Sequence, residues 1–137
     1  MRPRQATCVA IGATAILIEG KPNSGKSSLA LSLIDRGAIL IGDDSVILQE
    51  HDGKLFASPH PETRGLLEVR NLGLLEMPVC ESAPVGLLIR LDANAPRFID
   101  EAQTESIEGV KIPVIVMWPD SSNMAMKAEL ALDRYGI

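Results

Sequence analysis

Apolar residues gather in short runs along the first third of the chain. Residues 7–11 and 15–19 are rich in branched apolar side chains, which predicts two strands. Residues 26–36 instead carry apolar side chains at helical spacing, and Gly37 follows them as a helix stop. The next apolar run, residues 38–42, predicts a buried strand. The order strand, strand, helix, strand is typical of an α/β domain.

The middle of the chain alternates between turn signals and apolar runs. Residues 45–49 and 54–57 flank an Asp-Gly pair at positions 52–53, which predicts a hairpin. Residues 58–64 contain two prolines and are interpreted as a loop with exposed polar side chains. Residues 66–75 have a mixed pattern, to which we assign no element.

The last third contains two further apolar runs and one helical pattern. Residues 85–91 and 111–118 predict strands, and the polar residues 94–105 separate them. Residues 121–135 predict a terminal helix with one of the two serines at its start as the N-cap. Because hairpins accompany the strand–helix–strand order, we expect an α/β fold with a mixed β-sheet and flanking helices.

Composition narrows the classes of function. A chain of 137 residues is long enough for one hydrophobic core, so we expect a single domain, residues 1–137. No apolar run approaches the length of a membrane span, and a net charge of -5 argues against nucleic acid as a partner. Cys8 and Cys80 fit buried, reduced thiols. The expected compartment is the cytoplasm.

A phosphate-binding motif stands between the second predicted strand and the first helix. The segment GKPNSGKS matches G-x-x-x-x-G-K-[ST], whose glycines let backbone N–H groups cradle phosphates at a helix N-terminus. Lysine at the seventh position reaches the β- and γ-phosphates of ATP, and the following hydroxyl ligates Mg²⁺. The predicted nucleotide-binding residues are Gly20, Lys21, Pro22, Asn23, Ser24, Gly25, Lys26, Ser27 and Ser28.

Phosphoryl transfer also needs an acidic group near the metal and the acceptor. Asp43 and Asp44 follow the strand at residues 38–42, and a crossover connection would bring them to the edge that holds the glycine loop. The pair could also be a simple strand end that starts a turn, since Asp is common there. Asp92, which follows the strand at residues 85–91, is a rival for the acidic role.

Three blocks of sequence resemble one family, the HPr kinase/phosphorylases, in particular the short proteobacterial forms that lack an N-terminal domain. The blocks are residues 16–27, residues 35–44, and residues 65–73. The third block reads GLLEVRNLG and is similar to the family signature G-L-L-E-V-R-G-L-G. General P-loop proteins have no comparable block, so the third match is the most specific.

The resemblance implies a P-loop fold of the phosphoenolpyruvate carboxykinase-like type and a serine kinase that phosphorylates HPr, a small phosphocarrier protein of the phosphotransferase system. ATP and Mg²⁺ are the implied cofactors, and a homo-oligomer, a hexamer in the family, is the implied assembly. Many members also remove the phosphate again. By the same resemblance Asp43 matches the catalytic carboxylate, acting with Lys26. Ser27, Asp44 and Glu68 match metal-binding positions, and Arg70 matches a partner-binding position.

The chain departs from the family pattern at several positions. Gln5 stands where the family commonly has a histidine, and Ser28 stands where an acidic residue is usual. Asn71 replaces a glycine of the signature, and residues 119–123 have no arginine where long forms carry a Pro-Gly-Arg-Asn-like stretch.

Two alternatives compete with the HPr kinase function. The substitutions Gln5 and Ser28 favour a nucleotide-binding regulatory module with weak or no phosphotransfer. A small-metabolite kinase would need a lid with several arginines, and Arg64 and Arg70 are too few for one.

Overall fold

The computed structural model describes residues 1–119 and 121–137. The elements of these residues, in chain order, are β1 (Arg2–Arg4), β2 (Thr7–Ile11), β3 (Thr14–Gly20), α1 (Lys26–Asp35), β4 (Ile39–Gly42), β5 (Val46–His51), β6 (Lys54–Pro59), β7 (Leu66–Val69), β8 (Gly73–Glu76), β9 (Ala83–Leu91), β10 (Gln103–Ile107), β11 (Val110–Met117) and α2 (Met124–Tyr135).

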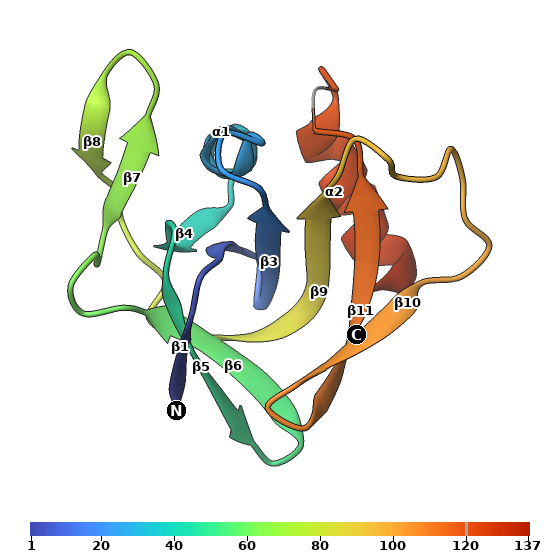
Figure 1. Cartoon of the computed structure of the whole chain (residues 1–137). Helices are drawn as coiled ribbons and strands as arrows, with labels where there is room; N and C mark the ends of the chain where they lie inside the picture. The colour runs from blue at the N-terminus through green and yellow to red at the C-terminus, as the bar shows by residue number, and fades with distance from the viewer. Residues whose placement is uncertain (120) are drawn as a thin grey trace.

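Within the described residues, nine strands form one curled, mixed sheet (Figure 1). The long strand β9 is its centre, since it pairs in parallel with both β3 and β11 and begins antiparallel to β6. The path continues on one side through β6, β5 and β1, and on the other through β3, β2 and β4. Strands β7 and β8 form a separate hairpin that stands apart from this sheet.

The connection β3–α1–β4 is the crossover that the sequence predicted, with one addition. Strand β2 lies between β3 and β4 and pairs antiparallel with both. Strands β3 and β4 therefore run in the same direction, and their carboxyl ends, Gly20 and Gly42, lie at the same edge of the sheet. The aspartates that follow β4 thus reach the edge that holds the glycine loop.

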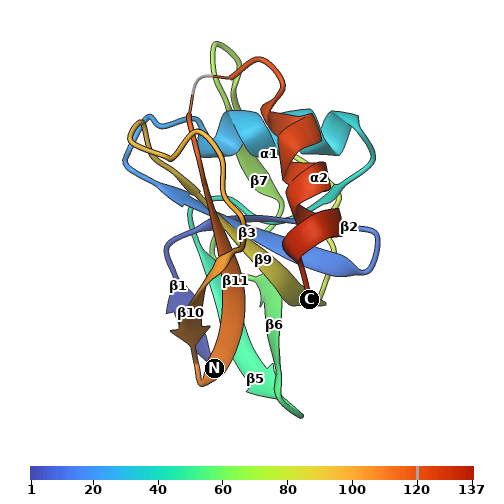
Figure 2. The same cartoon turned by 90° about the vertical axis from the view of Figure 1, so that its right-hand side faces the viewer.

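Two apolar cores lie on opposite faces of the sheet. Helices α1 and α2 cover one face (Figure 2), where Leu29 and Leu33 of α1 and Ala128 of α2 are buried. On the other face the sheet curls over side chains such as Leu17 and Leu48. Neither α1 nor α2, the helices of the described residues, has the length and hydropathy that a bilayer-crossing helix needs.

The structure differs from the sequence prediction in several places, and β1 is a strand that no sequence pattern predicted. Residues 66–75, left without an element, belong to the β7–β8 hairpin. The polar residues 94–105 end in β10, which is an edge strand with mostly exposed side chains and so lacks apolar alternation. Helix α2 takes Asn123 as N-cap, not Ser121 or Ser122. Serine and asparagine both cap helices well, so their chemistry could not choose among the three positions. Asp120, in the stretch without arginine, lies outside the described residues.

Candidate functional site

The glycine loop passes from the end of β3 to the start of α1. Gly25 adopts φ = 101° as the N-cap residue, a left-handed conformation that favours glycine. A Cβ at Gly20 would collide with the Ser24 hydroxyl. The ammonium of Lys26 donates to the carbonyl oxygens of Gly20 (2.9 Å) and Lys21 (3.2 Å), which hold it over the loop. The loop therefore has the backbone and the cation of an anion-binding site.

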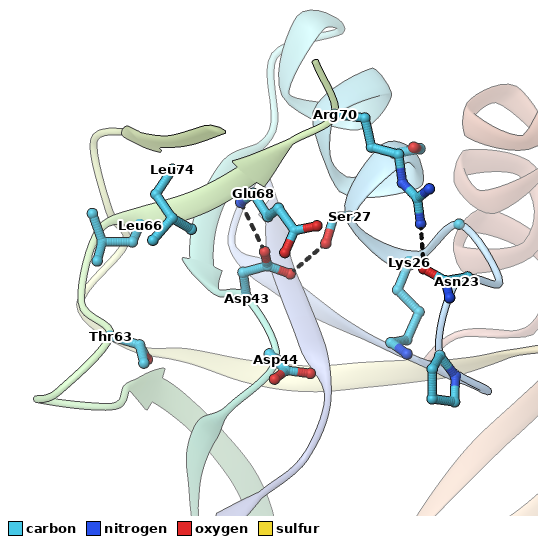
Figure 3. A pocket seen from close by; sticks show the side chains of 13 residues that line it. Asn23, Lys26, Ser27, Asp43, Asp44, Thr63, Leu66, Glu68, Arg70 and Leu74 are labelled. Atoms are coloured by element: carbon cyan, nitrogen blue, oxygen red, sulfur yellow. Dashed lines mark hydrogen bonds between the residues drawn. The ribbon is translucent and has the colours of Figure 1, made fainter. Parts of the chain in front are cut away.

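Asp43 connects the loop to two other segments of the chain. Figure 3 shows its hydrogen bonds to Ser27 and to the backbone of Glu68. Its Oδ1 accepts hydrogen bonds from the hydroxyls of Ser27 (2.8 Å) and Thr7 (2.9 Å). Its Oδ2 accepts one from the backbone N–H of Glu68 (3.0 Å). Only 8% of Asp43 is exposed, so these three donors replace most of the water that an ionised carboxylate needs.

Asp44 has a different environment although it is the next residue. It is exposed, and its φ of 69° turns the chain sharply after Asp43. Its backbone N–H donates to the Thr7 hydroxyl (3.4 Å). The positive φ thus turns two consecutive carboxylates to different surroundings, one inside the hydrogen-bond network and one open to water.

The β7–β8 hairpin brings the third sequence block to the loop. Arg70, which follows β7, donates from Nη2 to the side-chain oxygen of Asn23 in the loop (2.6 Å). The Glu68 side chain points toward Asp43 and Ser27 (Figure 3). The sequence alone placed neither residue in space, because it assigned no element to this segment.

Two cavities flank the glycine loop. The smaller, of about 330 Å³, includes Ser27, Asp43, Glu68 and Arg70 among its lining residues. The larger, of about 1120 Å³, includes Gly20, Lys21 and Ser24 of the loop. Pro22, Lys26 and Asp44 line both. All residues that the sequence singled out for nucleotide, metal, catalysis or partner line one cavity or the other, and their roles stay predictions.

Two positions discussed from the sequence lie at the larger cavity. Gln5 and Asp92 are both part of its wall. The Asp92 carboxylate accepts a hydrogen bond from the backbone N–H of Asn94 (2.8 Å), so it shapes the turn after β9. Asp43 is the acid that contacts Ser27, and the geometry therefore favours Asp43 over its rival.

A network of four charges supports the larger cavity. Arg4 bonds to Glu19 (2.5 Å) and Glu105 (2.9 Å), and Arg90 bonds to the same two carboxylates (3.1 and 2.8 Å). The hydrogen bond from Arg90, and then that from Arg4, lower the pKa of Glu105, against the opposing effect of its partial burial. The four residues come from β1, β3, β9 and β10, so no local pattern in the sequence could have revealed the network.

The loop and its neighbours fit a nucleotide with a magnesium ion. The Ser24 hydroxyl is buried in the loop without a hydrogen-bond partner among the described residues, and a phosphate oxygen would satisfy it. The Ser27 and Asp43 oxygens lie 2.8 Å apart and are hard donors of the kind Mg²⁺ prefers. No cluster of three or more metal-ligating side chains occurs in the described chain. Magnesium bound with a nucleotide needs none, because phosphates and water supply most of its ligands.

The comparison with known proteins agrees with this geometry. Residues 3–133 match the family described as HPr Serine kinase C-terminal domain. The chain belongs to this family. The matched residues include all three blocks that the sequence singled out, and with them the hairpin that carries Glu68 and Arg70.

Curated relatives are considerably longer than this chain. The HPr kinase/phosphorylase of Caldicellulosiruptor bescii is 31% identical over 93% of this chain and 46% of its own length. That of Clostridium tetani is 42% identical over 56% of this chain and 28% of its own length. The chain thus spans less than half the length of these relatives.

A solved structure has the same fold. The Hpr(Ser) kinase/phosphatase from Coxiella burnetii matches with a TM-score of 0.86 and 27% identity, over 97% of this chain and 89% of that chain. The predicted fold class, an α/β P-loop fold of the phosphoenolpyruvate carboxykinase-like type with a mixed sheet, is confirmed. In the described residues of this chain, the two helices α1 and α2 lie together on one face of the sheet.

Proposed function

We propose that this chain transfers the γ-phosphoryl group of ATP to a serine of an HPr-type phosphocarrier. The observation that carries the proposal is the contact of Asp43 with both Ser27 of the glycine loop and Glu68 of the hairpin. A glycine loop alone is common to many nucleotide-binding proteins. Its connection to the family's signature segment is the feature that favours this reaction, and the relatives' names support it.

The chain's own residues have distinct roles in the proposed transfer. The loop N–H groups and the Lys26 ammonium neutralise the phosphates and keep them in line with the acceptor. Asp43 receives the proton of the acceptor hydroxyl; its carboxylate has about four acceptor sites, of which the three observed hydrogen bonds leave one free. In the reverse direction the Asp43 carboxyl group returns that proton to the serine oxygen.

The magnesium ion belongs to the proposal as well. Ser27, Asp44 and Glu68 are the residues we assign to it, and all three line the smaller cavity. Bound there, the ion would neutralise charge on the β- and γ-phosphates. Arg70, at the rim of the same cavity, is assigned to the protein acceptor.

The test is transfer of label from ATP with magnesium to purified HPr-type phosphocarrier. The native chain is compared with Lys26→Ala and Asp43→Asn, with Lys54→Ala on the distant β6 as a matched control. We expect label on a serine with the native chain and the control, and none with the two site variants. Labelling that persists in Asp43→Asn would exclude Asp43 as the proton acceptor.

A second candidate is a nucleotide-binding regulatory module with weak or no phosphotransfer. Gln5 favours it, since this residue lines the larger cavity beside Lys26 and Asp44 and cannot exchange protons near neutral pH as an imidazole can. The same experiment separates the candidates. ATP binding that depends on Lys26, without label on any acceptor, would support the regulatory module.

We also infer that the chain works in the cytoplasm as a homo-oligomer. Cys8, which is buried, and Cys80, which is only partly buried, are both free cysteines, and this supports the compartment. The resemblance to a hexameric family supports the assembly. Light scattering on the purified protein measures the particle mass directly, and a mass of one chain at micromolar concentration would contradict the oligomer.

A further inference from the structure

Thr7 is an unusual residue for the start of a core strand. Its exposed fraction is 0%. Among the described residues, Thr7 and Asp43 are the two buried polar or charged residues. The neighbouring positions of β2 are apolar and buried, as expected for a strand covered on both faces. A threonine here needs partners for its hydroxyl, because burying an unpaired hydroxyl is costly.

Both partners of the Thr7 hydroxyl belong to the aspartate pair. The hydroxyl donates to Oδ1 of Asp43 (2.9 Å) and accepts from the backbone N–H of Asp44 (3.4 Å). The first bond restricts the rotation of the Asp43 carboxylate. The second supports the left-handed turn at Asp44, whose φ of 69° is unfavourable for a residue other than glycine.

The Ser27 hydroxyl has a second task during the reaction. It donates to the same Oδ1 in this structure (2.8 Å), but a serine at this place of a glycine-loop motif turns its oxygen to a metal when nucleotide binds. Thr7 lies on β2, outside the loop, and has no such second task. Thr7 is therefore the side-chain donor to Oδ1 whose two hydrogen-bond partners both belong to the aspartate pair.

We propose that Thr7 is a positioning residue that orients both carboxylates of the Asp43–Asp44 pair for phosphoryl transfer. The proposal rests on the transfer function inferred above. Thr7 acts through the aspartates and does not itself contact the phosphates or the acceptor. Loss of its hydroxyl should therefore slow the chemical step more than it weakens nucleotide binding.

The kinetic test compares Thr7→Val, which keeps the shape and removes the hydroxyl, with Thr7→Ser, which keeps the hydroxyl. We expect Thr7→Val to lower kcat by about ten- to hundredfold, the equivalent of one hydrogen bond to a charged group, with the KM for ATP nearly unchanged. Thr7→Ser should keep kcat within about threefold of native. Thr104→Val, the same change on an exposed position of β10, is the matched control.

A native rate for Thr7→Val, or equal slowing by Thr7→Ser, would overturn the proposal. If Thr7→Val does not fold, as judged by its thermal unfolding, Thr7→Ala replaces it in the same comparison with Thr7→Ser.

Amide hydrogen exchange provides a readout that does not depend on activity. The Asp44 and Glu68 N–H groups both bond to the network that Thr7 holds. Faster exchange at these two amides in Thr7→Val, but not in Thr7→Ser, supports the positioning role even if the native chain labels no acceptor. In that case only the transfer function fails. Unchanged exchange at both amides would contradict the positioning role.

Discussion

The crossover β3–α1–β4 and the β7–β8 hairpin both contribute to the same cavity, yet they are held in place differently. In the crossover, Leu29, Leu33 and Leu40 are at most 2% exposed. The hairpin buries Leu67 fully but leaves Leu72 69% exposed. At the site the hairpin is also held by the bonds of Glu68 to Asp43 and of Arg70 to Asn23.

This difference separates two requirements of the proposed reaction. Phosphate binding needs a preorganised cradle, which a loop between a core strand and a core helix supplies. Recognition of a protein acceptor needs an accessible surface, which an exposed hairpin supplies. Changes to the crossover should therefore act on stability and nucleotide binding, and changes to the hairpin on transfer.

The largest expected effect is on the stability of the crossover. Leu33→Ala removes a side chain that is 0% exposed, and should lower the free energy of unfolding by about 2–5 kcal/mol. Leu72→Ala, the same change at the exposed tip of the hairpin, should change it by less than about 0.5 kcal/mol. Chemical denaturation measures both. Similar losses for the two variants would show that the hairpin is packed as firmly as the crossover.

Arg70→Ala tests the hairpin's contact with the loop. The variant loses the bond to Asn23 and the proposed contact with the acceptor, and should lower kcat/KM for transfer by about ten- to hundredfold. Arg64→Ala is the control, because Arg64 forms an exposed ion pair with Glu81 away from the loop. Equal losses in the two variants would argue that positive charge alone, not the position of Arg70, matters.

Gly25→Ala tests the cradle itself. Alanine at φ = 101° is strained, so stability should fall by about 1–2 kcal/mol and the start of α1 should move. Gly12→Ala is the control, because it imposes a related strain at φ = 60° in the turn between β2 and β3. Titration calorimetry should show weaker ATP binding for Gly25→Ala only. If ATP binds both variants equally well, the left-handed N-cap is not needed for phosphate binding.

The smallest expected effect concerns the network of four charges that supports the larger cavity. The hydrogen bond from Arg90 lowers the pKa of Glu105 from its ordinary 4.5, so the ionised carboxylate is more favourable in the folded state than in the unfolded state. This stabilisation is present above pH 4.5 and is lost as the pH falls through the lowered pKa. With 34% of the side chain exposed, screening limits it to about 1 kcal/mol or less.

Glu105→Gln should therefore be slightly less stable than the native chain at neutral pH. The difference should shrink as the pH falls below 4.5, and thermal unfolding at several pH values measures it. High salt should reduce it as well. A difference that stays constant with pH would show that packing, not charge, accounts for the effect of the variant.

The sequence by itself determined the parts of the site that depend on local rules. The motif at residues 20–27, the helix after it and the strand that ends before Asp43 are each defined by neighbours in the chain. Dihedral preferences, helical spacing and the fixed hand of crossovers act over short distances, so a pattern reveals them. The resemblance of residues 65–73 to the family signature indicated that this segment belongs to the site, but not where it lies in the fold.

Only the tertiary structure decided which distant groups meet at Asp43. The Thr7 hydroxyl is 36 residues away in sequence, the Glu68 amide is 25 away, and Arg70 reaches Asn23 over 47 residues. The hairpin pattern was ambiguous because its fold position depends on Leu67 entering a core built by other elements. Such contacts form when separate strands are brought together by burial of apolar surface, and that burial is a property of the whole chain.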